Sequence, residues 1–292
     1  HFEPLPPPLP SAHDAVPLTA VPSEYRAALP ENVDWALDHA VRADLDTDGH
    51  PDYIVAYRLP ESGEIQVSVL FGTGGSVREV FPRGGNGAAE PLVALDGIWV
   101  AGLSAEGPTA ILIGNSMGAS AGSLLEVYAA VNAGKGTAPD GKDEPFRGPP
   151  NVRYVDTLSY HHVEWGDFDQ DGWTEFATWT KDTGNAYQVE VYQFQQEATN
   201  GLMPDEKAYP DYFPRVVAYY EQLTAGLSAR IYWYYLADAA AKSGQTEKAA
   251  KALQRGLAQP EEDYPETERF LDLAERYDLP MEDPLSPGED EN

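Results

Sequence analysis

The chain has no cysteine and few basic side chains. Without cysteine, neither a disulfide framework nor a thiolate nucleophile can form. Only 19 lysine and arginine side chains stand against 48 aspartates and glutamates, which gives a formal net charge of −29. Such a charge repels nucleic-acid phosphates and anionic lipid, so we expect neither as a partner, and it favours cations and basic surfaces. Halophilic proteins are also acidic, so a cytosolic protein of a halophile stays open.

Long apolar runs are missing as well. No stretch approaches the roughly 18 residues of a membrane span, so no transmembrane helix is predicted. The first ten residues, "HFEPLPPPLP", contain five prolines and are typical of a polyproline-like tether, so we interpret residues 1–30 as an N-terminal arm. A start at His1 fits a mature form trimmed of a signal peptide, with a lipid anchor upstream, or a leftover tag residue.

The material for a folded core is nevertheless present. Hydrophobic residues make up 42% of the 292 residues, with 17 Tyr, 6 Trp and 9 Phe, so bulk disorder is excluded. Short segments rich in β-branched and aromatic residues predict strands: "DYIVAYRL", "EIQVSVLF", "TAILIG", "SLLEVYAAV", "TEFATWT" and "QVEVYQF". Several alternate polar and apolar residues, as in 188–192, which predicts one buried face.

Aspartate-rich stretches repeat along these strands. "DLDTDGHPD" at 44–52 and "DFDQDGWTE" at 167–175 place acids at the same offsets around a glycine. "GLSAEGPTA" at 102–110 keeps the same frame but retains only Glu106 among the acids. A strand valine follows each glycine at nearly the same interval. We therefore infer three repeats, near 33–90, 91–150 and 151–200, with the extra length of the second in the Gly/Pro-rich segment 133–150.

These repeats suggest the fold class of the first two thirds of the chain. Units of three or four antiparallel strands resemble propeller blades. Three blades are few for a closed ring, so residues 31–200 are predicted to form a partial propeller or a curved array. The sequence as a whole predicts a multidomain β + α protein.

The last third of the chain is predicted to be helical. "YPDYFPRVVAYYEQL", from Tyr209, carries apolar residues at helical spacing, and "ARIYWYYLADAAAKSGQTEKAAKALQRGLAQP" predicts two helices broken at Gly244. The tetratricopeptide pattern is matched at Trp233, Leu236, Ala237, Ala240, Ala249, Leu253 and Pro260. With a further helix near 265–278, we expect a small tetratricopeptide-like domain over 208–279, separable from the β repeats, and an acidic disordered tail over 280–292. A protein partner or self-association is predicted through this domain or the N-terminal arm.

Both acidic loops have the pattern of a calcium site. Calcium takes 6–8 oxygen ligands, and acids at positions 1, 3 and 5 with a glycine at position 6 suit a tight loop around it. An EF-hand would place a glutamate at position 12, where Val55 and Thr178 stand instead, so position 9 must close the site. The predicted ligands are Asp44, Asp46, Asp48, His50 and Asp52 in one loop and Asp167, Asp169, Asp171, Trp173 and Glu175 in the other, with His50 and Trp173 acting through backbone carbonyls. Two structural calcium ions are predicted, and none at 102–110.

The residues "DLDTDGHPDYIVAY" and "DFDQDGWTEFATW" resemble the FG-GAP (VCBS-type) repeats of integrin-like propellers and bacterial surface proteins. The resemblance covers roughly 30–200 and implies calcium-binding loops that brace the blades. The layout with a tyrosine-rich helical tail is also similar to secreted or lipid-anchored proteins of Gram-positive bacteria. That likeness implies an extracellular or cell-surface location.

Two functions remain open from the sequence. Repeat architectures offer surfaces more often than reaction centres, which favours a non-enzymatic, calcium-stabilised module for interaction, adhesion or assembly. The alternative is a carbohydrate-active enzyme, similar to a polysaccharide lyase, for which Tyr160, His161 and His162 are the only candidates. A metal site at His161, His162 and Glu164 is not favoured, because adjacent side chains on a strand point to opposite faces.

Overall fold

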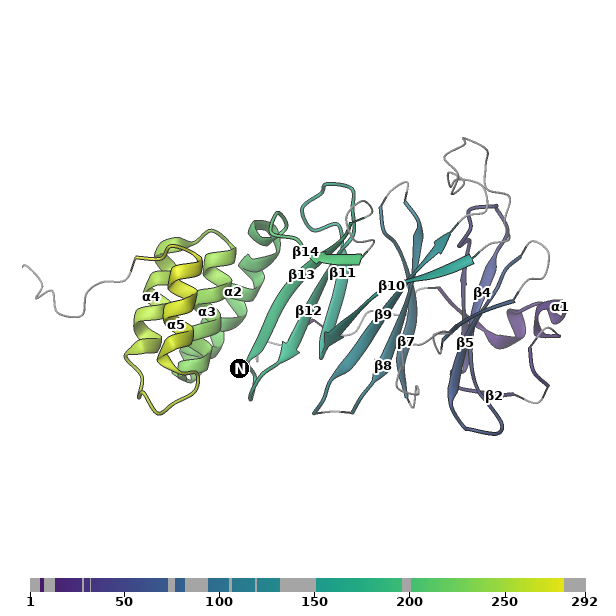
Figure 1. The fold of residues 1–292 in the computed structure, drawn as a ribbon, viewed down its shortest axis with the longest axis horizontal. Helices are drawn as coiled ribbons and strands as arrows, with labels where there is room; N and C mark the ends of the chain where they lie inside the picture. Colours follow the sequence, from purple (N-terminus) through teal and green to yellow (C-terminus); the bar gives the residue numbers. More distant parts are fainter. Residues whose placement is uncertain are drawn as a thin grey trace, which may run out of the picture.

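The computed structural model of the chain describes residues 6–7, 14–27, 29–31, 33–72, 77–81, 94–104, 107–118, 120–131, 151–195 and 201–280. Three antiparallel sheets and a group of helices follow one another along the long axis of an elongated molecule (Figure 1). None of the three sheets closes on itself. The predicted combination of antiparallel β and α structure is therefore confirmed.

The first sheet contains the first acidic repeat. Its strand order is β1 (Ala15–Pro17), β3 (His39–Ala43), β4 (Asp52–Arg58), β5 (Ile65–Leu70) and β6 (Val77–Phe81), and β2 (Asp34–Trp35) pairs with β4. A 3₁₀ turn, η1 (Leu18–Ala20), and α1 (Ser23–Arg26) follow β1. Val21 and Leu29 pack on Tyr53 and Tyr57 of this sheet. Residues 15–26 of the predicted arm are therefore part of the first sheet and its cover.

The second and third sheets are simple meanders. The second contains β7 (Leu95–Gly102), β8 (Thr109–Ser116), β9 (Ser123–Val131) and β10 (Asn151–Tyr160), and the third contains β11 (His162–Gly166), β12 (Glu175–Lys181), β13 (Tyr187–Gln195) and β14 (Gly201–Pro204). Because β10 pairs with β9 along its length, the third unit begins near His162 and differs from the predicted start at 151. The segment 133–150, which lies outside the described residues, joins two strands of one sheet.

Each sheet packs against a neighbour on both faces. Ile54 and Val67 of the first sheet share a core with Ile111 of the second, and Val127 of the second shares another with Phe176 of the third. The predicted single buried face is found in 188–192, where Val189 and Val191 are buried and Gln188 is exposed, whereas all six residues of β5 are buried. β5 lies within the stack of sheets and has no solvent face, which explains why it is so apolar.

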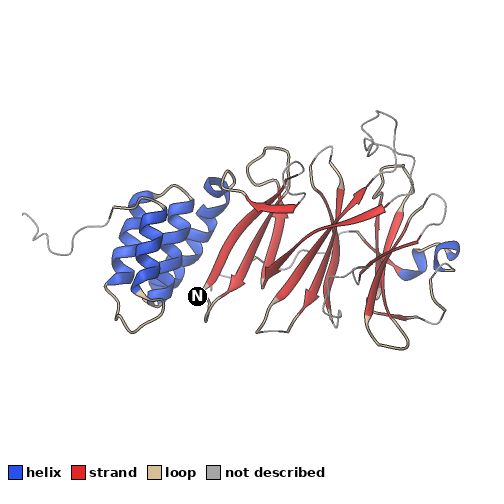
Figure 2. Ribbon diagram, viewed as in Figure 1, coloured by secondary structure: helices blue, strands red, loops and turns tan. Residues whose placement is uncertain are grey.

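Apart from α1, which lies beside the first sheet, the helices gather at the other end of the molecule, beyond the third sheet (Figure 2). They are α2 (Tyr209–Gly226), α3 (Arg230–Lys242), α4 (Thr246–Leu257) and α5 (Thr267–Arg276). Their positions follow the predicted helical segments, with Gly244 in the turn between α3 and α4 at a φ of 76°. No helix among the described residues is long and apolar enough to cross a membrane.

The helices and the third sheet share one hydrophobic core. Trp179, Tyr187 and Val191 of the sheet pack in the same cluster as Tyr212 and Tyr220 of α2. The hydroxyl of Tyr220 donates to the carbonyl oxygen of Tyr187 at 2.6 Å. A separable helical domain was expected from the polar sequence near 195–210, but this shared core ties the helices to the β region.

Candidate metal centres

The two acidic loops occupy the same place in the first and third sheets. Residues 44–51 connect β3 to β4, and residues 167–174 connect β11 to β12. In the first sheet, β3 and β4 begin the four-stranded meander from β3 to β6. In the third sheet, β11 and β12 begin the meander from β11 to β14. The segment 103–108, between β7 and β8, takes the same position in the second sheet. The three related sequence segments therefore lie at equivalent connections of the three sheets.

Both acidic loops bend in the same way. Thr47 and Gln170, at position 4, have φ values of 55° and 63°, and Gly49 and Gly172, at position 6, have 86° and 89°. Glycine adopts this left-handed conformation freely, whereas threonine and glutamine do so at a cost. Two left-handed residues so close together curl the backbone, so the acids of positions 1, 3 and 5 gather.

The same hydrogen bonds hold both curls. The backbone N–H of Gly49 donates to Oδ2 of Asp44 at 3.0 Å, and Gly172 donates to Oδ2 of Asp167 at 3.1 Å. One residue further on, His50 donates from its backbone to Oδ1 of Asp48 at 2.7 Å, as Trp173 does to Asp171 at 2.8 Å. These bonds fix the carboxylates by local geometry, so the sequence pattern sets the shape of the loop.

The loop of the third sheet gathers four carboxylates. Asp167, Asp169, Asp171 and Glu175 each offer an oxygen within 4.8 Å of the others. The side-chain amide of Gln193 donates to Asp171 and Glu175 at 3.1 Å each. Burial raises the pKa of Glu175 to about 7 and also raises the pKa of Asp169. This loop therefore brings together the predicted side-chain ligands, including the one at position 9.

The loop of the first sheet gathers three carboxylates, those of Asp44, Asp46 and Asp48. Asp52, at position 9, is fully buried and accepts backbone N–H bonds from Leu45 at 2.7 Å and Gly72 at 2.8 Å. Burial raises its pKa to about 6 despite these bonds. Asp52 thus lies outside the group of three, and its two backbone hydrogen bonds tie the loop to Gly72 just after β5.

The remaining predicted ligands are backbone groups. His50 is exposed, and its Nδ1 lies 3.3 Å from Oδ1 of Asp48. Trp173 forms an isolated antiparallel bridge with Ser104 of the second sheet. The ligand role of the carbonyls of His50 and Trp173 stays a prediction.

Two buried carboxylate oxygens have no hydrogen-bond partner among the described residues. They are Oδ1 of Asp46, in the first loop, and Oδ2 of Asp205, just after β14. Burial raises the pKa of Asp169, and the negative charges of Asp171 and Asp205 raise it further, which links Asp205 to the third-sheet loop. Sequence reasoning missed Asp205, because it lies outside the repeat and no spacing connects it to the loop.

The loop of the second sheet has none of these acids in the described residues. Gly102, Ser104 and Ala110 occupy the aligned positions, and Glu106 lies outside the described residues. Thr174 donates from its backbone to the carbonyl of Leu103 at 3.0 Å and from its hydroxyl to Gly102 at 2.6 Å. This loop is therefore held by direct contact with the third-sheet loop.

The residues of the enzymatic alternative, Tyr160, His161 and His162, lie where β10 ends and β11 begins. Tyr160 is buried and donates to Oδ2 of Asp96 at 2.8 Å. His161 accepts a backbone N–H bond from Lys181 through Nδ1, and the rings of both His161 and His162 pack edge-on against Tyr187. A base and a proton donor must reach one substrate atom, and the hydroxyl of Tyr160 is buried and already donates to Asp96.

Comparisons with known proteins give no assignment. No known family model matches the sequence, and no curated protein matches it. The loops and surfaces of this chain therefore carry the evidence for its function.

Proposed function

We propose that each acidic loop binds one calcium ion and that the two ions stabilise a non-enzymatic interaction module. The observation that carries the proposal is the duplicated loop, with the same left-handed residues and the same hydrogen bonds at equivalent places in two sheets. Acidic turns on a surface are common. A second copy with the same internal geometry favours a shared ligand.

Calcium is the cation that suits these donors best. The loops offer carboxylate oxygens, which hard cations prefer, and the chain contains no thiolate. Magnesium demands a nearly octahedral set and keeps several waters, whereas calcium accepts an irregular set of 6–8 oxygens. Asp167, Asp169, Asp171 and Glu175 would be the protein ligands of one ion, and Asp44, Asp46 and Asp48 those of the other.

The ion in the third sheet would stabilise more than its own loop. Thr174 of this loop hydrogen-bonds to the second sheet, and the ring of Phe168 lies 4.8 Å from that of Tyr212 in α2. An ion here would relieve repulsion among four acids at a junction of two sheets and a helix. We therefore expect calcium to stabilise both the β region and the helices.

The proposal also includes the type of repeat in each half of the chain and the location of the protein. Three open sheets stacked face to face, with equivalent loops in two of them, support an FG-GAP-like partial propeller. Four consecutive helices support a small tetratricopeptide-like region. An extracellular or cell-surface location is part of the proposal, since loops of this kind function where calcium is plentiful. The buried hydroxyl of Tyr160, which donates to Asp96, favours this role over a lyase.

Calorimetry and thermal unfolding test the proposal together. We expect two calcium ions per chain with dissociation constants of roughly 10⁻⁴–10⁻³ M, as in extracellular modules. Calcium at one hundred times the dissociation constant adds about 2.7 kcal/mol per site to the free energy of unfolding, provided that it binds only the folded state. Identical melting curves in chelator and in millimolar calcium, with no heat of binding, would show that the loops are turns that bind no calcium.

A further inference from the structure

Helix α4 concentrates positive charge in a strongly acidic protein. Lys248, Lys251 and Arg255 are three of the 19 basic residues of the chain, and they lie within eight consecutive residues. Their spacing of three and four residues places them along one face of the helix. The only acid on α4 is Glu247. This face therefore differs in sign from the net charge of the protein.

These side chains line a groove between two helices. The groove has a volume of about 460 Å³, with Glu221, Thr224 and Ala225 of α2 on one side and the basic face of α4 on the other. Trp233 and Leu236 of α3 line it between the two walls, which gives the groove an apolar floor.

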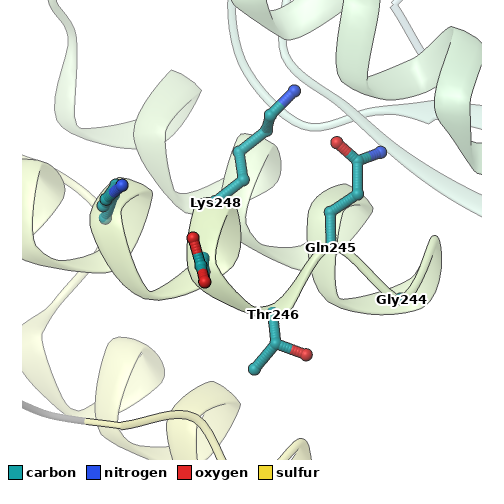
Figure 3. Close-up of a pocket in the computed structure, with 6 residues that line it drawn as sticks. Gly244, Gln245, Thr246 and Lys248 are labelled. Atoms are coloured by element: carbon teal, nitrogen blue, oxygen red, sulfur yellow. The ribbon is translucent and has the colours of Figure 1, made fainter.

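A second hollow, of about 550 Å³, continues from the groove at the start of α4 and shares Lys248 and Lys251 with it. Figure 3 shows the side chains of Lys248 and Gln245 directed to the same side of the turn at Gly244. The basic face of α4, which we call the basic wall, therefore lines two adjoining hollows.

The basic side chains of the groove have different partners. Lys248 forms an ion pair with Glu221 at 2.6 Å, which links the two walls. The guanidinium of Arg255 lies over the ring of Trp233, 5.1 Å from its centroid. The side chain of Lys251 is exposed, and its ammonium forms no hydrogen bond or ion pair with any described residue. Lys251 and Arg255 are therefore available to an anionic ligand.

We propose that this groove binds an extended acidic peptide segment of a partner protein. Arg255 lies four positions after Lys251, which is about 6 Å along the helix axis. Alternate side chains of an extended peptide are about 6.6 Å apart, so two acids in that register can pair with both cations. An apolar side chain of the peptide can then rest on Trp233 and Leu236.

The distribution of charge favours a short acidic peptide over a long polyanion. Screening limits each charge to about 8 Å at physiological salt, so a short segment experiences mainly the basic wall. A nucleic acid or an anionic membrane extends further and meets the acidic remainder of the protein. The proposal rests on the interaction role proposed above but is independent of calcium.

Fluorescence anisotropy tests the proposal on the full chain. The probe is a labelled synthetic peptide in which aspartate alternates with leucine, and the matched probe carries asparagine in place of aspartate. We expect binding of the acidic peptide alone, weakened about tenfold by Lys251→Glu and again by Arg255→Glu. Arg153→Glu, the same charge change on exposed β10, should leave the affinity unchanged.

Controls separate this proposal from the calcium proposal and from other ligands. Binding measured in chelator should match binding in calcium, and the Lys251→Glu variant should keep the melting temperature of the parent. Equal affinity of the parent and both groove variants, or equal binding of the asparagine peptide, would overturn the proposal. Binding that arises only after removal of residues 281–292 would assign the groove to the acidic segment of the chain itself and also overturn it.

Discussion

Trp179 of β12 donates a hydrogen bond from Nε1 to the hydroxyl oxygen of Tyr212 in α2, at 2.8 Å. Tyr212 in turn donates to Glu164 of β11, which is paired with Arg215 of α2 at 2.7 Å. Burial and the neighbouring charge of Glu164 raise the pKa of Tyr212, so it stays a neutral hydroxyl. This chain of contacts lies where the third sheet meets the helices.

Replacing Tyr212 by phenylalanine should destabilise the sheet and the helices together. The change leaves the buried indole N–H of Trp179 without its acceptor, which costs about 1–3 kcal/mol in the free energy of unfolding. Urea unfolding monitored by far-ultraviolet circular dichroism and by tryptophan fluorescence measures it. Tyr264→Phe removes a hydroxyl that donates to Asp182 at an exposed position, so it should cost less than Tyr212→Phe. Two separated transitions in the parent protein would argue against the shared core.

Changing Asp46 or Asp169 to asparagine should each remove one calcium ion. Each change takes one carboxylate from one loop, so calorimetry should report one site in each single variant and none in the double variant. The rise in melting temperature that calcium causes should be smaller in each single variant than in the parent protein. The matched control is Asp34→Asn, an exposed acid outside the loops, which should retain both sites. A double variant that still takes up two ions would place the sites elsewhere.

Asp205→Asn should weaken calcium at the third-sheet loop without abolishing it. The negative charge of Asp205 acts on Asp169, and removing it reduces the attraction for a cation by about 1 kcal/mol, or about fivefold in affinity. Calorimetry on the Asp46→Asn background isolates this site. An affinity equal to that of the background would show that Asp205 lies too far from the ion to matter.

Lys242 should be essential to the junction between α3 and β13. Its ammonium lies 3.1 Å from Glu190 and 3.4 Å from Asp238. Burial alone would lower the pKa of Lys242, but the attraction of Asp238 and Glu190 outweighs burial and raises it. Lys242→Met leaves both acids without their cation and should cost about 3–5 kcal/mol.

The double variant Lys242→Met/Glu190→Gln serves as the control for this charge effect. It should recover part of the loss, because one uncompensated charge is removed with the lysine. Urea unfolding of the single and double variants measures the coupling between the two side chains. If the double variant recovers no stability, the loss in Lys242→Met comes mainly from the packing of the lysine methylene groups.

His162 should make the protein less stable in mild acid. Burial lowers the pKa of His162, although a hydrogen bond to the backbone of Pro7 opposes this. The unfolded chain therefore takes up the proton first, so stability is full above pH 6.5 and falls as the pH decreases toward the lowered folded-state pKa. Urea unfolding between pH 8 and pH 5, in saturating calcium, should show a shallower loss for His162→Gln. Equal slopes for the two proteins would remove His162 as the cause.

The sequence by itself determined the local structure. Acids and a glycine at fixed offsets specify the bend of the two loops, because the bonds that hold the curl itself, as between Gly49 and Asp44, join residues no more than five apart. Helical spacing from Tyr209 and the break at Gly244 likewise located the helices. Such features depend on neighbours along the chain, which a sequence displays directly.

Only the tertiary structure decided which distant segments meet. The pairing of β10 with β9, the burial of Asp52 behind its loop and the position of Asp205 all depend on contacts between residues far apart in the chain. The shared core of Trp179 and Tyr212 has the same origin, since aromatic residues at helical spacing indicate a buried face without naming its partner. Packing free energy, summed over many side chains, selects that partner, and no short pattern encodes this sum.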